Sequence, residues 1–358
     1  MALREWRGGF VASVMAVVVG CGGEGASERE PLVPADPNAN PSPGGSGWQA
    51  PAAPEAGSPV ALHGQLSVRD GDLVDAAGAP VQLKGVSTMW LNWENNYASS
   101  KDGMRWLRDN WGLSVVRAAM GIEPANAYLN NPTGMANNAR TVVRNAIELG
   151  LYVIIDWHDH TAHMHQQQAS DYFAAAAQEF GAFPNVFYET YNEPMQVDWT
   201  TVVKPYHEAV TAVIRQHDPD NVIILGTPTW SQRVDIAATN PVVGTNLMYT
   251  VHFYSCEHRG TQRGQALAAR QLGLPIFVTE WGATTANGGT DPNGQVCAEE
   301  AQLWHDFMNQ ESISWTAWKL DDCTDLSCLL RTAAPRTGGW TDEWLNGHGP
   351  FVRDRMME

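Results

Sequence analysis

The chain has 358 residues, of which 44% are hydrophobic and 17% are charged. This much apolar material fills a large core, and the low charge content excludes an intrinsically disordered protein. The formal net charge of −17 argues against a surface for nucleic acid or anionic membranes, so we expect no nucleic-acid partner and a neutral or cationic ligand.

Residues 1–21 have the composition of an export signal that ends in a lipidation site. A basic start is followed by an apolar run over residues 10–19, which is too short to span a bilayer. The run leads into the letters VVGC, which are similar to a bacterial lipobox, so we predict a lipoprotein signal peptide and a lipid anchor on Cys21. Gly22 after this cysteine favours the outer membrane or cell surface, with release as a secreted protein as the second option. An ordinary signal peptide with an incidental cysteine is the alternative.

Residues 22–59 are rich in glycine, proline, alanine and serine and show no hydrophobic period. Such a segment cannot bury enough apolar surface to fold by itself. We therefore predict a flexible linker over 22–59 that holds one folded domain, residues 60–358, clear of the membrane. We expect this protein to be a monomer.

From about residue 63 the chain alternates short apolar runs with amphipathic helical stretches. The eight candidate strands are 81–86, 113–118, 151–156, 185–190, 221–225, 247–253, 275–280 and 312–318. Their continuous apolar runs are typical of a parallel sheet covered by helices. Eight such strands close into a barrel, so we predict an α/β fold, a (β/α)8 TIM barrel. A doubly wound open sheet is the alternative, but no GxGxxG or P-loop motif follows the first strand.

Polar and aromatic side chains occur at the ends of these strands, where TIM barrels carry their active sites. They are Arg117, His158, Asn192, Glu193, His252, Tyr254, Glu280 and Trp318. A closed barrel brings them to one rim. Two carboxylates on such a rim fit glycosidic bond cleavage, since one protonates the leaving oxygen and the other attacks or stabilises the anomeric carbon. We assign these roles to Glu193 and Glu280, and expect Glu189 and Asp156 to be structural.

Between His63 and Met356 the chain resembles glycoside hydrolase family 5, and in particular its bacterial endoglucanases. The stretches that carry the resemblance include VIIDWH, YNEP, GTPTWSQ, VHFY, FVTEWG and SWTAW. The resemblance implies a retaining endo-β-1,4-glucanase, a cellulase, that hydrolyses β-1,4-glucan by double displacement. It also implies Glu193 as acid/base, Glu280 as nucleophile and Asn192 as the partner of the sugar 2-hydroxyl. Lichenan, xyloglucan and mannan are the alternative substrates.

This division of labour sets requirements that the structure can test. Retention requires the two carboxyl groups to lie about 5 to 5.5 Å apart. The two groups also need different pKa values. We expect Arg117 and Tyr254 to lower the pKa of Glu280, and the neighbouring carboxylate to raise the pKa of Glu193.

The remaining rim residues are expected to bind and orient the sugar. His158 and His252 would support the site as hydrogen-bonding residues. Trp93, Trp230 and Trp318 would form the platform on which sugar rings stack, with core packing as the alternative for each tryptophan.

The chain departs from the family pattern in two places. Met89 and Trp90 stand where close family members usually carry His and Gly, so one expected sugar-binding histidine is missing. Lys319 follows Trp318 where Ser or Ala is commoner, and we expect it to add a cationic contact to the substrate.

Two other functions compete with glycoside hydrolysis. A zinc-dependent barrel hydrolase would use the histidines of HDHTAHMH, namely His158, His160, His163 and His165. The other strand ends lack a matching ligand set, so we expect no metal and no cofactor. A non-catalytic glucan-binding lipoprotein is the second rival, but binding alone needs neither Glu193 nor Glu280.

Four cysteines follow Cys21, an even number in a chain that we expect to be exported into an oxidising compartment. Three pairings are possible. We favour Cys323 with Cys328, which lie in one loop, and therefore Cys256 with Cys297. A metal site is the alternative, but no CxxC spacing supports it.

Overall fold

The computed structural model describes residues 48–94 and 96–358. The predicted signal peptide, its Cys21 lipidation site and the larger part of the predicted linker lie outside these residues. Within the described part of the chain, no helix is both long enough and apolar enough to cross a bilayer.

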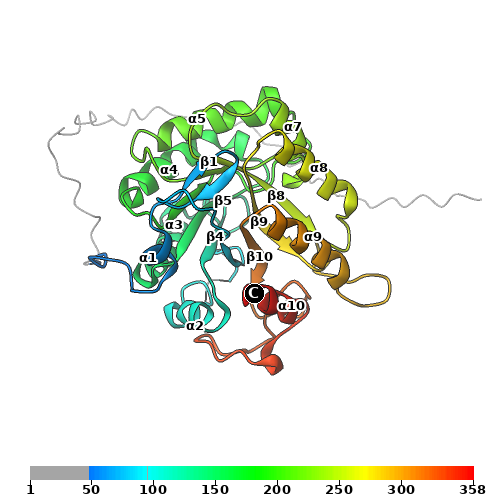
Figure 1. Ribbon diagram of the computed structural model, residues 1–358. Helices are drawn as coiled ribbons and strands as arrows, with labels where there is room; N and C mark the ends of the chain where they lie inside the picture. Colours follow the sequence, from blue (N-terminus) through cyan, green and yellow to red (C-terminus); the bar gives the residue numbers. More distant parts are fainter. Residues whose placement is uncertain (1–47, 95) are drawn as a thin grey trace, which may run out of the picture. The chain divides into compact units, whose positions relative to one another are not determined.

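Eight parallel strands close into a barrel in the order β10-β3-β4-β5-β6-β7-β8-β9, and helices lie around its outside (Figure 1). The strands are β3 Lys84–Thr88, β4 Val115–Gly121, β5 Tyr152–His158, β6 Val186–Glu189, β7 Ile223–Leu225, β8 Leu247–Tyr254, β9 Ile276–Gly282 and β10 Trp315–Leu320. Each predicted strand overlaps one of them. The prediction of a TIM barrel is confirmed.

The helices begin and end at residues whose chemistry favours those ends. They are α1 Pro59–His63, α2 Lys101–Trp111, α3 Pro132–Leu149, α4 Gln166–Phe180, α5 Lys204–Ile214, α6 Pro228–Ser231, α7 Val234–Thr239, α8 Gly260–Gln271, α9 Ala298–Gln310 and α10 Gly349–Met356. Ser100 caps α2 and Asn131 caps α3, each by accepting a hydrogen bond from a backbone N–H of the first turn. Gly112 and Gly150 end these helices with φ of 77° and 65°, which glycine adopts without steric cost.

Two apolar layers hold the barrel together. The outer layer lies between strands and helices and includes Val116 and Val153. The inner layer fills the barrel where the strands begin and includes Val115, Ile154 and Phe187. Alternate residues of one strand therefore pack on opposite sides of the sheet.

An antiparallel hairpin precedes the barrel and was not predicted from the sequence. It pairs β1 Ser67–Arg69 with β2 Asp72–Val74. Asp70 and Gly71 form its turn with φ of 52° and 89°, the positive values that a two-residue hairpin turn requires. Leu73 packs in the inner apolar layer, so the hairpin helps to close the end of the barrel where the strands begin.

The chain contacts the barrel earlier than the predicted linker boundary. Trp48 donates a hydrogen bond from Nε1 to Glu148 Oε1 at 2.8 Å. Glu55 forms an ion pair with Arg108 of α2 at 2.8 Å. Trp48 therefore lies against α3 and Glu55 against α2, although both residues fall within the predicted linker.

The predicted disulfides are confirmed. Cys256 is bonded to Cys297, and Cys323 is bonded to Cys328. Cys256 follows β8 and Cys297 precedes α9, so the first bond joins the loops after β8 and β9. The second bond lies within the loop after β10.

Three buried histidines belong to the core and not to the rim. Burial lowers the pKa of His207 to about 4, of His305 to about 3 and of His348 to about 4. His305 packs against Trp281 and Trp315, with ring centroids 4.4 and 5.1 Å away. Its Nε2 has no hydrogen-bond partner among the described residues. All three imidazoles are therefore neutral near pH 7.

The two disulfides should differ in their effect on stability. The Cys256–Cys297 bond spans 41 residues and the Cys323–Cys328 bond spans 5. Because a longer closed loop restricts the unfolded chain more, replacing the first pair by alanine should cost about 4 kcal/mol of unfolding free energy, and replacing the second about 2 kcal/mol. Guanidinium unfolding of the two double variants measures this difference. A larger loss from the short loop would contradict it.

The buried histidines should make the protein sensitive to acid. An unfolded histidine binds a proton below about pH 6.5, whereas these three resist protonation until about pH 3 to 4, so the unfolding free energy falls through this window as the pH drops. His305→Phe keeps the aromatic contact and removes one titrating group. The loss between about pH 7 and pH 4.5 should then shrink by about 2 kcal/mol in guanidinium unfolding. The exposed His217→Phe is the control and should leave the loss unchanged.

Candidate active site

A cavity of about 370 Å³ lies at the end of the barrel where the strands finish. Its wall includes both proposed carboxylates and four large aromatic side chains, namely Glu193, Glu280, Trp90, Trp230, Tyr254 and Trp318. The structure therefore brings residues from the ends of six different strands, or from the loops after them, into one site, as the barrel prediction requires.

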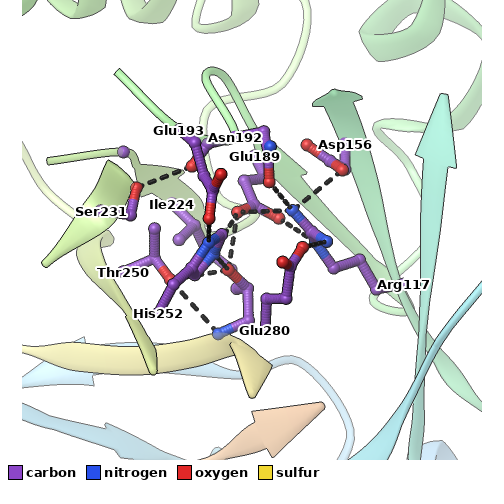
Figure 2. A network of polar contacts seen from close by, with 12 residues as sticks. Arg117, Asp156, Glu189, Asn192, Glu193, Ile224, Ser231, Thr250, His252 and Glu280 are labelled. Atoms are coloured by element: carbon purple, nitrogen blue, oxygen red, sulfur yellow. Dashed lines mark hydrogen bonds and ion pairs between the residues drawn. The ribbon is translucent and has the colours of Figure 1, made fainter. Parts of the chain in front are cut away.

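Arg117 of β4 is the centre of the charge network beneath this cavity (Figure 2). Its guanidinium is fully buried and contacts Glu189 at 2.7 Å, Glu280 at 2.9 Å and Asp156 at 3.0 Å. Burial opposes the charge of Arg117, but the three carboxylates outweigh burial and raise its pKa. Arg117 and His252 likewise outweigh burial at Glu189 and lower its pKa to about 2. Asp156 and Glu189 are both inaccessible to solvent, as expected for structural carboxylates.

Each carboxylate oxygen of Glu280 accepts a hydrogen bond from a buried side chain. Arg117 Nη1 donates to Oε2 at 2.9 Å, and Tyr254 Oη donates to Oε1 at 2.6 Å. Burial and the charge of Glu280 raise the pKa of Tyr254 well above its usual value, so the phenol keeps the proton that it donates. These two hydrogen bonds fix the orientation of the Glu280 carboxylate.

Glu193 lies just beyond β6 and is held by two imidazoles. His252 Nδ1 lies 2.9 Å from its Oε1, and His160 Nε2 lies 3.4 Å from its Oε2. Burial favours a higher pKa for Glu193, but His160 and His252 outweigh burial and lower it. The expected raised pKa of Glu193 is therefore wrong, because His160 and His252 contact the carboxylate and lower its pKa.

The two carboxylates face one another across a short gap. One carboxylate oxygen of Glu193 and one of Glu280 lie within 4.8 Å of each other, and one ring nitrogen of His252 lies within the same distance of both. A sugar ring that enters the cavity would therefore contact both carboxyl groups.

Asn192 and His158 lie beside this pair. Asn192 accepts a hydrogen bond at Oδ1 from Arg117 at 2.6 Å, and its buried Nδ2 has no partner among the described residues. The Nδ2 group is thus a fixed donor beside the carboxylates. His158 is bonded through Nδ1 to Asp156 at 2.6 Å and stacks against Trp318 with ring centroids 5.4 Å apart.

The aromatic platform differs in part from the predicted one. Trp318 and Trp230 line the cavity, and Trp230 is 37% exposed. Trp93 is 57% exposed and does not line the cavity, but it stacks on Trp90 with ring centroids 4.8 Å apart. Trp90 provides the ring that faces the cavity. Trp90 was expected only to depart from the family pattern and not to line the site.

Lys319 does not contribute the expected cationic contact to the cavity. Its Nζ forms an ion pair with Asp325 Oδ2 at 3.0 Å, and the side chain is nearly buried. A lysine at this depth needs a carboxylate partner, and Asp325 in the following loop supplies it. Lys319 therefore fixes the loop after β10.

The run of four histidines does not converge on a metal site. Each has a different partner: His158 with Asp156, His160 with Glu123 and Glu193, His163 with Tyr191, and His165 with Asp159. Within residues 48–94 and 96–358, no cluster of three potential metal ligands contains any of these histidines. The zinc hypothesis therefore loses the ligand set on which it depended.

The sequence shows clear similarity to known endoglucanases. The model of the cellulase family (glycosyl hydrolase family 5) matches residues 74–324. Endoglucanase 5 of Pectobacterium carotovorum subsp. carotovorum is 43% identical over 303 residues, which are 84% of this chain and 59% of that protein. An endoglucanase of Clostridium saccharobutylicum is 43% identical over 298 residues, 82% of this chain and 65% of that protein. This chain thus spans less than two thirds of the length of these two relatives.

Solved structures agree with these matches. The catalytic domain of a Thermobifida fusca endoglucanase has a TM-score of 0.79 at 33% identity, over 84% of this chain and 100% of that domain. A structure from Cytophaga hutchinsonii has a TM-score of 0.80 at 40% identity, over 84% of this chain and 96% of that chain. A variant of the Thermobifida domain was solved in complex with cellotetraose. From the family model, these relatives and the shared barrel, the chain belongs to glycosyl hydrolase family 5, the cellulase family.

Proposed function

We propose that this protein is a retaining endo-β-1,4-glucanase that hydrolyses β-1,4-glucan. The relatives named endoglucanase and the cellotetraose complex of a related domain support this substrate class. The single observation that carries the proposal is the pair of carboxylates within 4.8 Å of one another, each with a different set of partners. A glucan-binding protein without activity would not need two acids that face each other across the sugar.

In the first half of the reaction Glu280 attacks the anomeric carbon. Arg117 and Tyr254 hold its carboxylate as an anion and fix its direction. Glu193 gives a proton to the glycosidic oxygen as the bond to the leaving sugar breaks, and a glycosyl ester forms on Glu280. The short separation of the carboxylates favours this retaining route, since inversion requires about 6.5 to 9.5 Å to admit a water molecule.

The proton for Glu193 comes from its imidazole neighbours. Glu193 is ionised in the free enzyme. Burial alone would lower the pKa of His252, but Glu280, Glu189 and Glu193 outweigh burial and raise it to about 9. His252 therefore carries a proton 2.9 Å from Glu193 and passes it on when the glycosidic oxygen approaches. In the second half Glu193 takes a proton from water, and the hydroxide attacks the ester on Glu280.

Asn192 and the aromatic rings bind the sugar during these steps. The unpaired Nδ2 of Asn192 is placed to donate to the 2-hydroxyl, a contact that strengthens at the transition state. Trp318, Trp230 and Trp90 offer flat apolar faces for the sugar rings.

We also propose that the enzyme is an exported lipoprotein, anchored through Cys21 at the outer membrane or cell surface and active as a monomer. The lipobox-like VVGC supports the anchor. Two disulfides in the folded domain fit an oxidising compartment. Metabolic labelling with a fatty acid, with Cys21→Ala as the unlabelled control, tests the anchor.

The substrate is tested with carboxymethyl-cellulose, lichenan and mannan. We expect hydrolysis of carboxymethyl-cellulose at least as fast as that of lichenan, and little or none of mannan, whose axial 2-hydroxyl would misalign with Asn192. The first sugar released should carry the β-anomer, which proton NMR detects before mutarotation. Initial release of the α-anomer would exclude the retaining mechanism, and preference for mannan would change the substrate.

Azide separates the roles of the two carboxylates. Glu280→Ala and Glu193→Ala should each lose on the order of 10³-fold or more in kcat on carboxymethyl-cellulose. With an activated aryl cellobioside and azide, Glu193→Ala should yield the β-glycosyl azide, because the ester on Glu280 still forms. Glu280→Ala should yield the α-glycosyl azide by direct attack. The reverse pattern would exchange the two assignments.

A further inference from the structure

A second charged pair contacts the proposed acid/base from outside the main network. His160 lies in the loop after β5, with Nε2 at 3.4 Å from Glu193 Oε2 and Nδ1 at 3.3 Å from Glu123 Oε2. Glu123 lies in the loop after β4 and also accepts a hydrogen bond from Thr161 Oγ1 at 2.6 Å. His160 thus bridges two carboxylates that come from different loops.

The surroundings hold this bridge in place. The Trp90 ring stacks over His160 with centroids 5.8 Å apart, and the Tyr191 hydroxyl donates to the backbone oxygen of His160 at 2.9 Å. The charged and titratable groups near His160 come from each neighbouring element: Glu123 after β4, His158 of β5, Asp159 in its own loop, Glu193 after β6 and, beyond Glu193, His252 of β8. Two of the carboxylates touch the imidazole directly.

We propose that His160, fixed by Glu123, is a positioning residue that orients the Glu193 carboxyl and holds a second proton for it. This inference rests on the proposed hydrolysis and adds to it a proton holder on the face of Glu193 opposite His252. Each turnover uses one proton: where His252 has already given up its own, the proton moves from His160 Nε2 to Glu193 Oε2, and Glu193 gives it to the leaving oxygen as that bond breaks. In the second half of the reaction Glu193 takes a proton from water and returns it to the imidazole that supplied the first one, which restores the starting state.

The electrostatics agree with this geometry. Burial alone would lower the pKa of His160, but Glu123 and Glu193 outweigh burial and raise it to about 10. The pKa of His252 is raised to about 9. Two imidazoles that both hold a proton near neutral pH therefore contact Glu193 from different loops. The alkaline limb of kcat/KM, which reports the free enzyme, belongs to this cluster as a whole.

Replacing His160 tests the proposal on two substrates. His160→Gln can still donate a hydrogen bond but cannot hold an ionisable proton. His252 then becomes the imidazole that supplies Glu193 with its proton. We expect the alkaline limb of kcat/KM for cellotetraose to move down by about one pH unit, with about a tenfold loss at the wild-type optimum. For 2,4-dinitrophenyl cellobioside, whose leaving group needs no proton, kcat/KM should change less than about twofold.

Glu123→Gln is the second variant. Loss of its charge lowers the pKa of His160, so the alkaline limb should move in the same direction by a smaller amount. The double variant should match His160→Gln alone, because Glu123 acts through His160. Glu123→Gln also keeps the test available if His160→Gln does not fold. The exposed His217→Gln is the matched control and should keep the wild-type profile.

The outcomes are distinct. An unchanged alkaline limb in both variants, or equal losses on the two substrates, overturns the role of His160 while leaving the proposed hydrolysis intact. Failure of the wild type to hydrolyse cellotetraose refutes the proposed function, and the role of His160 falls with it. Additive losses in the double variant would show that Glu123 acts independently of His160, which also overturns the proposal.

Discussion

The site depends on one buried guanidinium. Arg117 places a positive charge inside the barrel that compensates Glu189 and Glu280, and it also contacts Asp156, whose pKa is raised because burial outweighs Arg117 there. Removing one partner of such a network typically costs about 3 to 5 kcal/mol, because the remaining charges stay buried. Arg117 therefore couples the stability of the barrel to the direction in which Glu280 points. The same residue orients Asn192, so Arg117 fixes both Glu280 and Asn192, the two groups proposed to contact the sugar.

The two acids differ because their partners differ. Glu280 receives hydrogen bonds from groups that cannot give up their protons near neutral pH, an arginine and a buried tyrosine. Glu193 instead contacts two imidazoles, which can both hold and release a proton. Two carboxylates of the same chemistry, within 4.8 Å of each other, thereby have different surroundings: one is fixed in orientation, and the other can exchange a proton with its neighbours. Position on the rim alone would not separate these roles.

The barrel and the two carboxylates were predictable because they follow from local patterns: apolar strands of regular spacing, each followed by a polar residue. The β1–β2 hairpin was missed although Asp70 and Gly71 carried its turn signal. The positions of Trp90, Glu123 and His160 had no such signal, since they depend on how three loops fold against one another. The error at Lys319 has the same cause, because its partner Asp325 lies in a loop whose path cannot be derived from periodicity.

The covalent bonds are distributed unequally around the cavity. The loops after β8, β9 and β10, on the side of Tyr254 and Glu280, are tied by the two disulfides. The segment after β3, which carries the Trp90 and Trp93 rings, contains no cysteine. Covalent cross-links therefore restrain the loops beside Glu280, whereas non-covalent contacts position the Trp90 and Trp93 rings on the other side of the cavity.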